Sequence, residues 1–349
     1  MKGDGNMTVI KMGIVGAGTW GETHAFIYND HPGAEVTAVC DMNIERAKAL
    51  ADKFNIPGNH VFTDHKEMLR SADIDAVAIV TPDFAHTRIA VDCANAGKHF
   101  IIEKPLTTSR EEADEIVEAV ERNNVRMMVD LHSRWSPLVA IPKKSIVDGD
   151  IGKPYSAYYR LNDIKWVATD LLPWAAKSSI LWFLGYHSVD VLRWLFDDEV
   201  ERVYSVSREG VLQGEGVDTV DIYQTILEFK NGGIATMENG WITPNSNPNV
   251  NDMKLNITGT KGMFNIDPTH SQMMERFTEM KADRPDLLVR HFIHGKPKGF
   301  AYESIRHFID HLISGEPFYV SMEDAYNTTM VILAIMESAK TRTPVNVVY

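Results

Sequence analysis

The sequence is poor in cysteine, in net positive charge and in long apolar runs. Its 349 residues include two cysteines, Cys40 and Cys93, both within apolar segments, which favours a reduced, intracellular protein over a disulfide-based fold. The net charge of -13 would repel nucleic-acid phosphates and anionic lipid headgroups. No apolar run is long enough to span a membrane, and the N-terminal MKGDGNM lacks a signal-peptide core. We therefore expect a cytoplasmic protein with no nucleic-acid and no membrane partner.

The rest of the composition is that of an ordinary globular protein, with 44% hydrophobic and 24% charged residues. Its length exceeds the size at which a single hydrophobic core keeps growing. The change in pattern near residue 130 places the expected domains at 1–130 and 131–349.

Short apolar, β-branched runs alternate with helical patterns in the first third of the chain. Strands are expected at 9–15, 35–40, 61–62, 76–80, 99–102 and 126–129. Ser109 and Glu112 form a capping box at the start of a helix over 109–123. Strands joined by helices cross over right-handed, so this pattern predicts a doubly wound parallel sheet, the Rossmann fold.

Strands separated by tight glycine turns dominate the second part. They are expected at 155–162, 201–207, 219–229, 233–241, 253–258 and 262–266, with helices at 180–195, 302–314 and 322–339. The pattern predicts an α+β domain with a large open, mostly antiparallel sheet. A sheet face left uncovered needs a partner, so we expect a homodimer or homotetramer joined through it.

The first strand runs into Gly16-Ala17-Gly18-Thr19-Trp20-Gly21, which has the spacing of a dinucleotide-binding turn. Gly16 permits the tight turn, Gly18 lets the backbone approach a pyrophosphate, and Gly21 lets the helix pack closely on the strand. Amide groups at the helix start, around Thr19 and Trp20, would bind the phosphates.

Asp41 ends the second strand, 20 residues after Gly21. A carboxylate at this position accepts hydrogen bonds from the adenosine ribose and repels a 2′-phosphate, which favours NAD over NADP. Two other interpretations stay open: Asp41 caps the helix that begins near Ile44, or Arg46 accommodates a 2′-phosphate.

Two further strands end in polar segments, Thr81-Pro82-Asp83-Phe84-Ala85-His86 and Glu103-Lys104-Pro105. Ligands of open α/β sheets bind outside the carboxyl ends of the strands, so both segments point at the cofactor crevice. A lysine ammonium there would stabilise the alkoxide that develops when a carbinol is oxidised. The alternative for Lys104 is an ion pair with Glu103 or another carboxylate.

The segment Gly185-Tyr186-His187-Ser188-Val189-Asp190 supplies a candidate general base. His187 and Asp190 are three residues apart on a helix and share a face, so the carboxylate can orient the imidazole. A structural histidine with satisfied hydrogen bonds is the alternative.

The second domain also holds candidates for a sugar pocket. Aromatic faces stack on sugar rings and polar side chains bind hydroxyls, although core packing explains the tryptophans equally well. The candidates are Arg134, Asn162, Lys165, Trp166 and Trp174. The pairs His291/His294 and His307/His311 lack a third ligand nearby, so no metal is expected.

Taken together, G-A-G-x-W-G, T-P-D-x-x-H, E-K-P and G-x-H-x-x-D resemble the motifs of the glucose-fructose oxidoreductase and inositol dehydrogenase (Gfo/Idh/MocA) family over nearly the whole chain. The resemblance implies bound NAD(H) or NADP(H), a dimer or tetramer, and Lys104 as the catalytic lysine. It also implies that Thr81, Pro82, His86 and Glu103 line the nicotinamide side of the cofactor, and it favours His187 as a catalytic residue. Many family members have an aspartate four residues before this histidine, where this chain has Phe183.

The sequence thus predicts an NAD-dependent enzyme that moves a hydride between nicotinamide and a secondary hydroxyl of a sugar, inositol or glycoside, with Lys104, His187 and Asp190 at the reacting centre. Phe183 and His187 would also contact the substrate. Two alternatives remain: a glycoside-cleaving enzyme that oxidises its substrate transiently and returns the hydride, and an NAD-binding sugar sensor without turnover.

Overall fold

The computed structural model describes residues 8–271, 273–280 and 282–349, which fall into two compact units. Unit 1 holds the described residues up to His132 together with Leu288–Ala325, and unit 2 holds Ser133–Leu287 and Tyr326–Tyr349. The expected boundary at residue 130 is close to the first division. Residues 288–325, however, pack with unit 1, although the sequence pattern had assigned them to the second domain.

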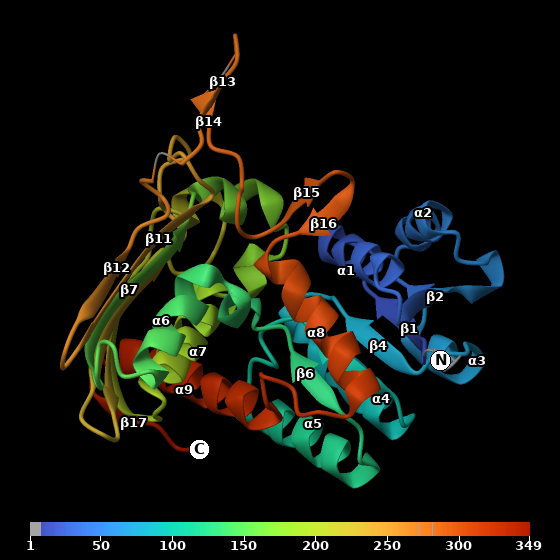
Figure 1. The fold of residues 1–349 in the computed structure, drawn as a ribbon, viewed down its shortest axis with the longest axis horizontal. Helices are drawn as coiled ribbons and strands as arrows, with labels where there is room; N and C mark the ends of the chain where they lie inside the picture. Colours follow the sequence, from blue (N-terminus) through green and yellow to red (C-terminus); the bar gives the residue numbers. More distant parts are fainter. Residues whose placement is uncertain (1–7, 272, 281) are drawn as a thin grey trace, which may run out of the picture. The chain divides into compact units, whose positions relative to one another are not determined.

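Unit 1 is built on a six-stranded parallel sheet, as the alternation of strands and helices predicted (Figure 1). The strand order is β3-β2-β1-β4-β5-β6, the order of a dinucleotide-binding Rossmann sheet. The strands are β1 (Ile10–Val15), β2 (Ala34–Cys40), β3 (Val61–Phe62), β4 (Ala76–Ile79), β5 (His99–Ile102) and β6 (Met127–Val129). Strand β4 and the later residues of β1 (12–15) and β5 (100–102) are buried on both faces, so they are continuously apolar rather than alternating.

The helices of unit 1 are α1 (Thr19–Asp30), α2 (Ile44–Phe54), α3 (His65–Ser71), α4 (His86–Asn95), α5 (Arg110–Asn123) and α8 (Phe300–Ser314), with short 3-10 turns at Gly58–His60 and Asp83–Ala85. Helix α5 begins as predicted, with Ser109 accepting a hydrogen bond from the Glu112 N–H. Helix α4 packs against α5 and α1 against α8. Helix α8 buries Ile305 and Phe308, which explains why this late segment belongs to unit 1. The hairpin of β15 (His291–Ile293) and β16 (Lys296–Lys298) precedes it.

Unit 2 contains a seven-stranded sheet in the order β12-β11-β7-β10-β9-β8-β17. Strands β7 and β10 pair in parallel and the other neighbours are antiparallel, so the expected mostly antiparallel sheet is confirmed. The strands are β7 (Pro154–Asp163), β8 (Val200–Arg208), β9 (Ile222–Phe229), β10 (Ile234–Gly240), β11 (Asn251–Gly259), β12 (Met263–Ile266) and β17 (Val345–Asn346). A separate hairpin joins β13 (Arg276–Phe277) and β14 (Ala282–Asp283).

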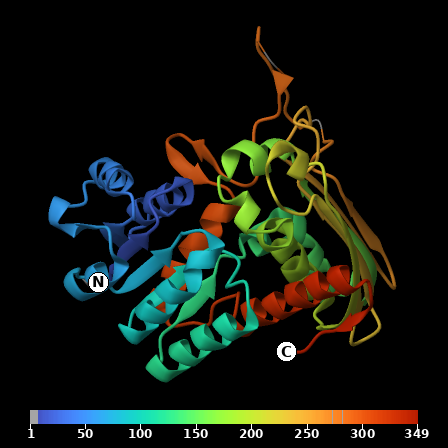
Figure 2. The ribbon, with the colours of Figure 1, turned by 180° about the vertical axis from the view of Figure 1, so that it is seen from behind.

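Helices lie along one face of this second sheet, as Figure 2 shows from behind. They are α6 (Pro137–Val147), α7 (Tyr186–Phe196) and α9 (Met322–Thr341), with π-helical turns at Val167–Leu171 and Leu181–Gly185 and 3-10 turns at His132–Trp135, Ala175–Lys177 and Gln213–Glu215. Among the described residues of unit 2, no helix covers the opposite face. Strand β9 accordingly alternates, with Thr225 and Leu227 buried and Ile226 exposed. No helix in the described part of the chain is long and apolar enough to cross a membrane.

Candidate active site

The loops that follow the strands of unit 1 begin in register at the carboxyl edge of the sheet. Backbone hydrogen bonds continue the parallel ladder for one step beyond the strands, with N···O distances of 2.8 to 2.9 Å. They join Gly16 N–H to Cys40 O, Val80 N–H to Val15 O, Glu103 N–H to Ile79 O and Asp130 N–H to Ile102 O. The glycine turn and the Thr81, Glu103 and Asp130 segments therefore leave the sheet side by side, where open α/β folds bind ligands.

The three glycines of the turn are required for different reasons. Gly16 has φ +108°, and a Cβ there would lie 2.3 Å from the Val80 carbonyl oxygen. A Cβ at Gly21 would lie 1.9 Å from the Gly16 oxygen, so helix α1 can approach β1 only without a side chain. A Cβ at Gly18, by contrast, would meet nothing within 4 Å. The backbone at Gly18 thus faces open space, as needed for the close approach of a pyrophosphate.

The start of helix α1 has no side-chain cap. Gly18 is its N-cap residue, and among the residues that the structure describes no side chain caps the helix by accepting a hydrogen bond. These donors and the positive end of the helix dipole suit an anion. The acidic residue of the first turn, Glu22, forms an ion pair with Lys53 of α2 at 2.5 Å. Near the same turn, the buried Thr81 Oγ1 has no hydrogen-bond partner within the described part of the chain. The residues present therefore fit a dinucleotide.

Asp41 is tied to the glycine turn rather than used as a helix cap. Its two carboxylate oxygens accept hydrogen bonds from the N–H groups of Ala17 and Asn43, both at 2.8 Å. The N-cap of α2 is Asn43, whose side chain accepts from the Glu45 and Arg46 N–H groups. A carboxylate offers about four lone-pair sites, so Asp41 keeps capacity for ribose hydroxyls. Arg46 lies within α2 and is exposed.

His86 joins two of the strand-end segments. Its ring nitrogens lie 2.8 Å from the Pro105 carbonyl oxygen and 2.9 Å from the Thr81 carbonyl oxygen. The ring is fully buried, and burial lowers its pKa against the opposing effect of these carbonyls. Pro82 and Lys104 are half-buried, and the Lys104–Pro105 peptide bond is cis. The buried His86 ring thus links the Thr81 segment to the Lys104 segment.

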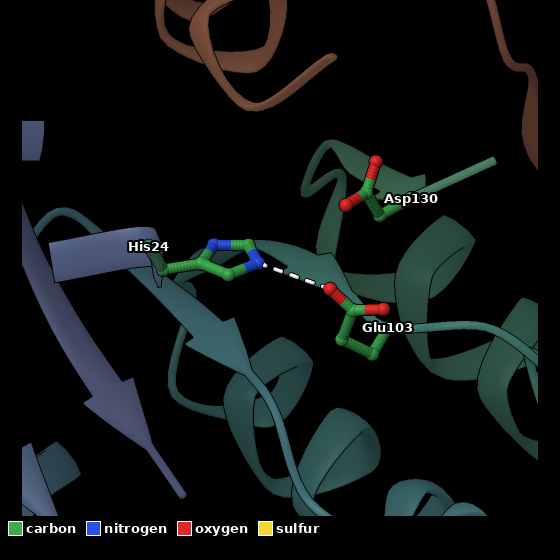
Figure 3. Close-up of side chains that lie close together, drawn as sticks. All are labelled: His24, Glu103 and Asp130. Carbon is green, nitrogen blue, oxygen red and sulfur yellow. Dashed lines mark hydrogen bonds and ion pairs between the residues drawn. The ribbon is translucent and has the colours of Figure 1, made fainter. Parts of the chain in front are cut away.

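Glu103 lies in a buried hydrogen-bonded chain that includes helix α1 (Figure 3). The His24 Nε2 atom is 3.2 Å from Glu103 Oε1, and His24 Nδ1 is 2.8 Å from the Tyr28 hydroxyl. All three side chains are at least nine-tenths buried. Burial, together with the negative charges of Asp130 and Glu103, raises the pKa of Tyr28, so its hydroxyl stays protonated.

Asp130 is the second buried carboxylate of this cluster. It accepts a hydrogen bond from the Ser304 hydroxyl of α8, and its other oxygen is 3.5 Å from His132 Nδ1. Burial would raise the pKa of Asp130, but the nearby imidazoles of His132 and His24 and the hydrogen bond from Ser304 outweigh it, and the pKa is lowered. His24, Glu103 and Asp130 offer ligand atoms within 4.8 Å of one another. Each of them is engaged with protein partners, so the cluster is a buried network of two carboxylates and two imidazoles.

Unit 2 holds the other catalytic candidate, on helix α7 directly after a π-helical turn. Phe183 lies in that turn, Leu181–Gly185, and π-helical turns occur frequently at functional sites. His187 is 5% exposed, and its Nδ1 is 3.4 Å from the Ser133 hydroxyl. The Phe183 ring centroid lies 5.8 Å from that of Trp241 and 6.3 Å from that of Trp174. Phe183 therefore forms part of an aromatic cluster.

Asp190 forms an ion pair with Arg134. The Arg134 Nε and one terminal nitrogen donate to the two carboxylate oxygens at 3.1 and 2.6 Å, a bidentate arrangement. Asp190 is fully buried and Arg134 is 6% exposed. The sequence analysis had placed Arg134 in the substrate pocket and assigned Asp190 to orient His187. In the structure the two side chains form a buried ion pair with each other, and both expected roles stay predictions.

The remaining substrate candidates of unit 2 have contacts of their own with nearby protein groups. Asn162 shares the helix-free face of the sheet with Arg160, and its side-chain amide donates to Glu238 at 2.7 Å. Lys165 pairs with Glu215, and Trp166 is 40% exposed.

Three buried members of the carboxyl-edge cluster escaped the sequence analysis. His24 follows Gly21 by three residues and so lies on the face of α1 that turns toward the sheet. Asp130 directly follows β6, the same signal that singled out Glu103 and Lys104. His132, two residues further on, was also missed.

The fold and this edge define a dinucleotide-binding oxidoreductase of the Rossmann class with a second α/β unit. Comparison with protein-family models agrees: an oxidoreductase family with an NAD-binding Rossmann fold matches residues 10–131, and the C-terminal alpha/beta domain of that family matches residues 143–347. The chain belongs to the Gfo/Idh/MocA family of oxidoreductases, and unit 1 carries the family's NAD-binding fold.

Relatives with stated activities align over most of the chain. The myo-inositol 2-dehydrogenase of Thermotoga maritima is 24% identical, covering 90% of this chain and 92% of its own. The levoglucosan dehydrogenase of Pseudarthrobacter phenanthrenivorans is 30% identical, covering 80% and 79%. The solved scyllo-inositol dehydrogenase of Lactobacillus casei, with bound NAD(H) and scyllo-inositol, superimposes with a TM-score of 0.81 at 21% identity, covering 97% of this chain and 99% of its own. At that identity the likeness shows the fold.

Proposed function

We propose that this protein is an NAD-dependent dehydrogenase that oxidises a secondary hydroxyl of a sugar, inositol or glycoside. The observation that carries the proposal is the carboxyl edge of unit 1, where the glycine turn, Asp41 and the segment containing Lys104 emerge side by side. When bound, NAD supplies the hydride acceptor. The relatives named for inositol and levoglucosan support the substrate class.

Two side chains handle the hydroxyl proton in this proposal. The Lys104 ammonium stabilises the oxygen as it gains negative charge, and the His187 imidazole accepts the proton as general base. Lys104 is held by its neighbours on both sides, since Glu103 bonds to His24 and the Pro105 carbonyl lies against His86. The Ser133 hydroxyl, 3.4 Å from His187 Nδ1, orients the imidazole.

Phe183, at the position where many family members have an aspartate, bears on which substrates the site can accept. A phenyl ring cannot accept a proton or bind a hydroxyl, so the third member of the usual lysine, aspartate and histidine set is missing. The half-buried aromatic rings of Phe183 and Trp174 instead suit the C–H face of a sugar ring or the apolar part of a glycoside. Asp41, near the adenosine ribose, favours NAD over NADP.

Turnover and binding of Lys104→Ala test the proposal. NADH formation at 340 nm with a panel of inositols, sugars and glycosides should fall by about 10²- to 10⁴-fold, the usual contribution of one acid or base, while NADH affinity stays nearly unchanged. Lys98→Ala is the matched control because Lys98 stands at the opposite end of β5 and bonds to the Ile74 carbonyl. Full turnover in Lys104→Ala would refute the assigned role.

Phe183 also favours a second candidate, an NAD-binding sugar sensor without turnover. The two functions separate on wild-type protein. NADH binding with no absorbance change across the whole substrate panel supports the sensor, and net NADH formation excludes it.

We further propose that the helix-free face of the unit 2 sheet joins two or more copies of the chain. The pairing register places five exposed apolar side chains on this face: Tyr204, Val206, Ile226, Ile234 and Met263. Such a patch is unusual on a monomer. Light scattering should give a mass of two or four chains, and a single-chain mass at micromolar concentration would contradict the proposal.

A further inference from the structure

The glycine turn carries no cation of its own. Residues 16–23 read Gly-Ala-Gly-Thr-Trp-Gly-Glu-Thr, and the whole chain has a net charge of -13. A dinucleotide brings negative charge on both phosphates to this turn. Helix N–H groups supply only partial positive charge. A basic side chain from elsewhere in unit 1 would complete the site.

Arg290 reaches the first turns of α1 from a segment about 270 residues later in the chain. One of its terminal nitrogens donates to the Thr23 hydroxyl at 3.1 Å, and the guanidinium carbon lies 5.2 Å from the centre of the Trp20 ring. The Thr23 hydroxyl in turn donates to the Thr19 carbonyl at 3.0 Å. These contacts place the guanidinium against Trp20 and Thr23, within the first turns of the helix that follows Gly18.

The segment that carries Arg290 is fixed to the start of α8. The Phe300 and Ala301 N–H groups donate to the carbonyls of Leu288 and Val289 at 2.9 and 3.1 Å. A Cβ at Gly299 would lie 2.4 Å from the Val289 oxygen and 2.9 Å from Arg290 Cα, so this approach depends on glycine. Helix α8 itself packs against α1. The guanidinium is therefore positioned by two neighbouring elements.

Trp20 is also positioned by the protein. Its ring stacks on that of His132, with centroids 5.5 Å apart and planes 17° apart, and His132 lies against the buried Asp130. The cation–π contact of an arginine uses the flat face of the guanidinium rather than its N–H groups.

We propose that Arg290 binds the diphosphate of the dinucleotide, with Trp20 and Thr23 holding its guanidinium at the start of α1. The planar N–H fork of an arginine matches two phosphate oxygens, and such charge-assisted bonds are stronger than neutral ones. The inference rests on the proposed cofactor binding and adds a residue from outside the βαβ motif to it. The competing explanation is that Arg290 only packs on Trp20 and stabilises unit 1.

Calorimetric titration with ADP-ribose, which carries the diphosphate without nicotinamide, separates these explanations. Arg290→Met should weaken ADP-ribose binding by about 10- to 100-fold, the effect of removing a hydrogen bond to a charged group. Arg290→Lys should lose less, because it keeps the charge. Arg306→Gln is the matched control, since Arg306 pairs with Asp30 at the opposite end of α1. Its affinity should equal that of the wild type.

Two outcomes of the titration overturn the inference: unchanged affinity in Arg290→Met, or equal losses in Arg290→Met and Arg306→Gln. If wild-type protein fails to bind ADP-ribose, the proposed cofactor function fails and the inference falls with it.

A second measurement uses wild-type protein and does not depend on any variant folding. ADP-ribose should protect Arg290, but not Arg306, from phenylglyoxal, as read by peptide mass spectrometry. Adenosine should not protect it. Equal modification of Arg290 with and without ADP-ribose would contradict the proposal.

Discussion

Replacing Asp190 by asparagine distinguishes a structural from a catalytic role for this carboxylate. Asp190 is fully buried and accepts both hydrogen bonds of the Arg134 fork. Asparagine keeps the shape of the side chain but removes its charge. The guanidinium of Arg134 would then remain in the interior without its counter-ion.

The expected loss follows from the burial of both partners. Removing one member of a buried ion pair costs about 3–5 kcal/mol, because the remaining charge is desolvated and uncompensated. For a unit of about 180 residues, 1 kcal/mol shifts the melting temperature by about 2–4 °C, so Asp190→Asn should lower it by roughly 6–20 °C. Replacing both partners by apolar residues, Arg134→Met with Asp190→Leu, should recover much of this loss.

Thermal unfolding followed by circular dichroism measures the effect. Asp197→Asn is the matched control, because Asp197 lies at the end of the same helix and pairs with Lys143 while its side chain is 84% exposed. Its loss should stay below about 1 kcal/mol. If Asp190→Asn melts together with this control but turnover collapses, the ion-pair explanation is wrong and Asp190 acts through His187.

Three other predictions concern unit 1. Gly18→Ala should fold normally but bind NADH poorly, whereas Gly21→Ala should lower the melting temperature, because only the second Cβ meets backbone; similar melting temperatures would contradict this. Asp41→Ala should reduce the preference for NAD over NADP by about tenfold or more in paired titrations, and an unchanged ratio would count against its ribose role. Burial and the charge of His311 lower the pKa of His307 to about 4, so the unfolded chain, which titrates near 6.5, takes up the proton first. Stability should therefore fall as pH drops from about 6.5 to about 4, and His307→Gln should flatten this dependence in melting curves.

The alternation of strands and helices in the first third was enough to predict the sheet of unit 1. Strands β3 and β5 have the predicted bounds, and the others differ by one residue, because buried parallel strands are short, apolar and bounded by polar turns. The placement of α8 could not be predicted in this way. Its amphipathic pattern shows that one face is buried, but a periodicity does not say which sheet buries that face.

The sequence anticipated the geometry of the site where a local motif encodes backbone conformation. The glycine turn and Asp41 lie together as their spacing required, and the Asn43 cap resolves the alternative for Asp41. Side-chain pairs between segments distant in the sequence could not be predicted. The Arg134–Asp190 pair spans 56 positions, and nothing in the sequence distinguishes it from the proposed pairing of Asp190 with His187.

Unit 1 is assembled from two stretches of chain, the described residues up to His132 and Leu288–Ala325. This division affects the order in which the protein folds during synthesis. The ribosome releases residues up to His132 long before it reaches Leu288–Ala325, which supplies the Ile305 and Phe308 surface that packs there. A nascent or truncated polypeptide that ends at His132 would expose the apolar surface that this segment covers. The dinucleotide-binding half of the molecule therefore completes its folding only after almost all of the other half has been synthesised.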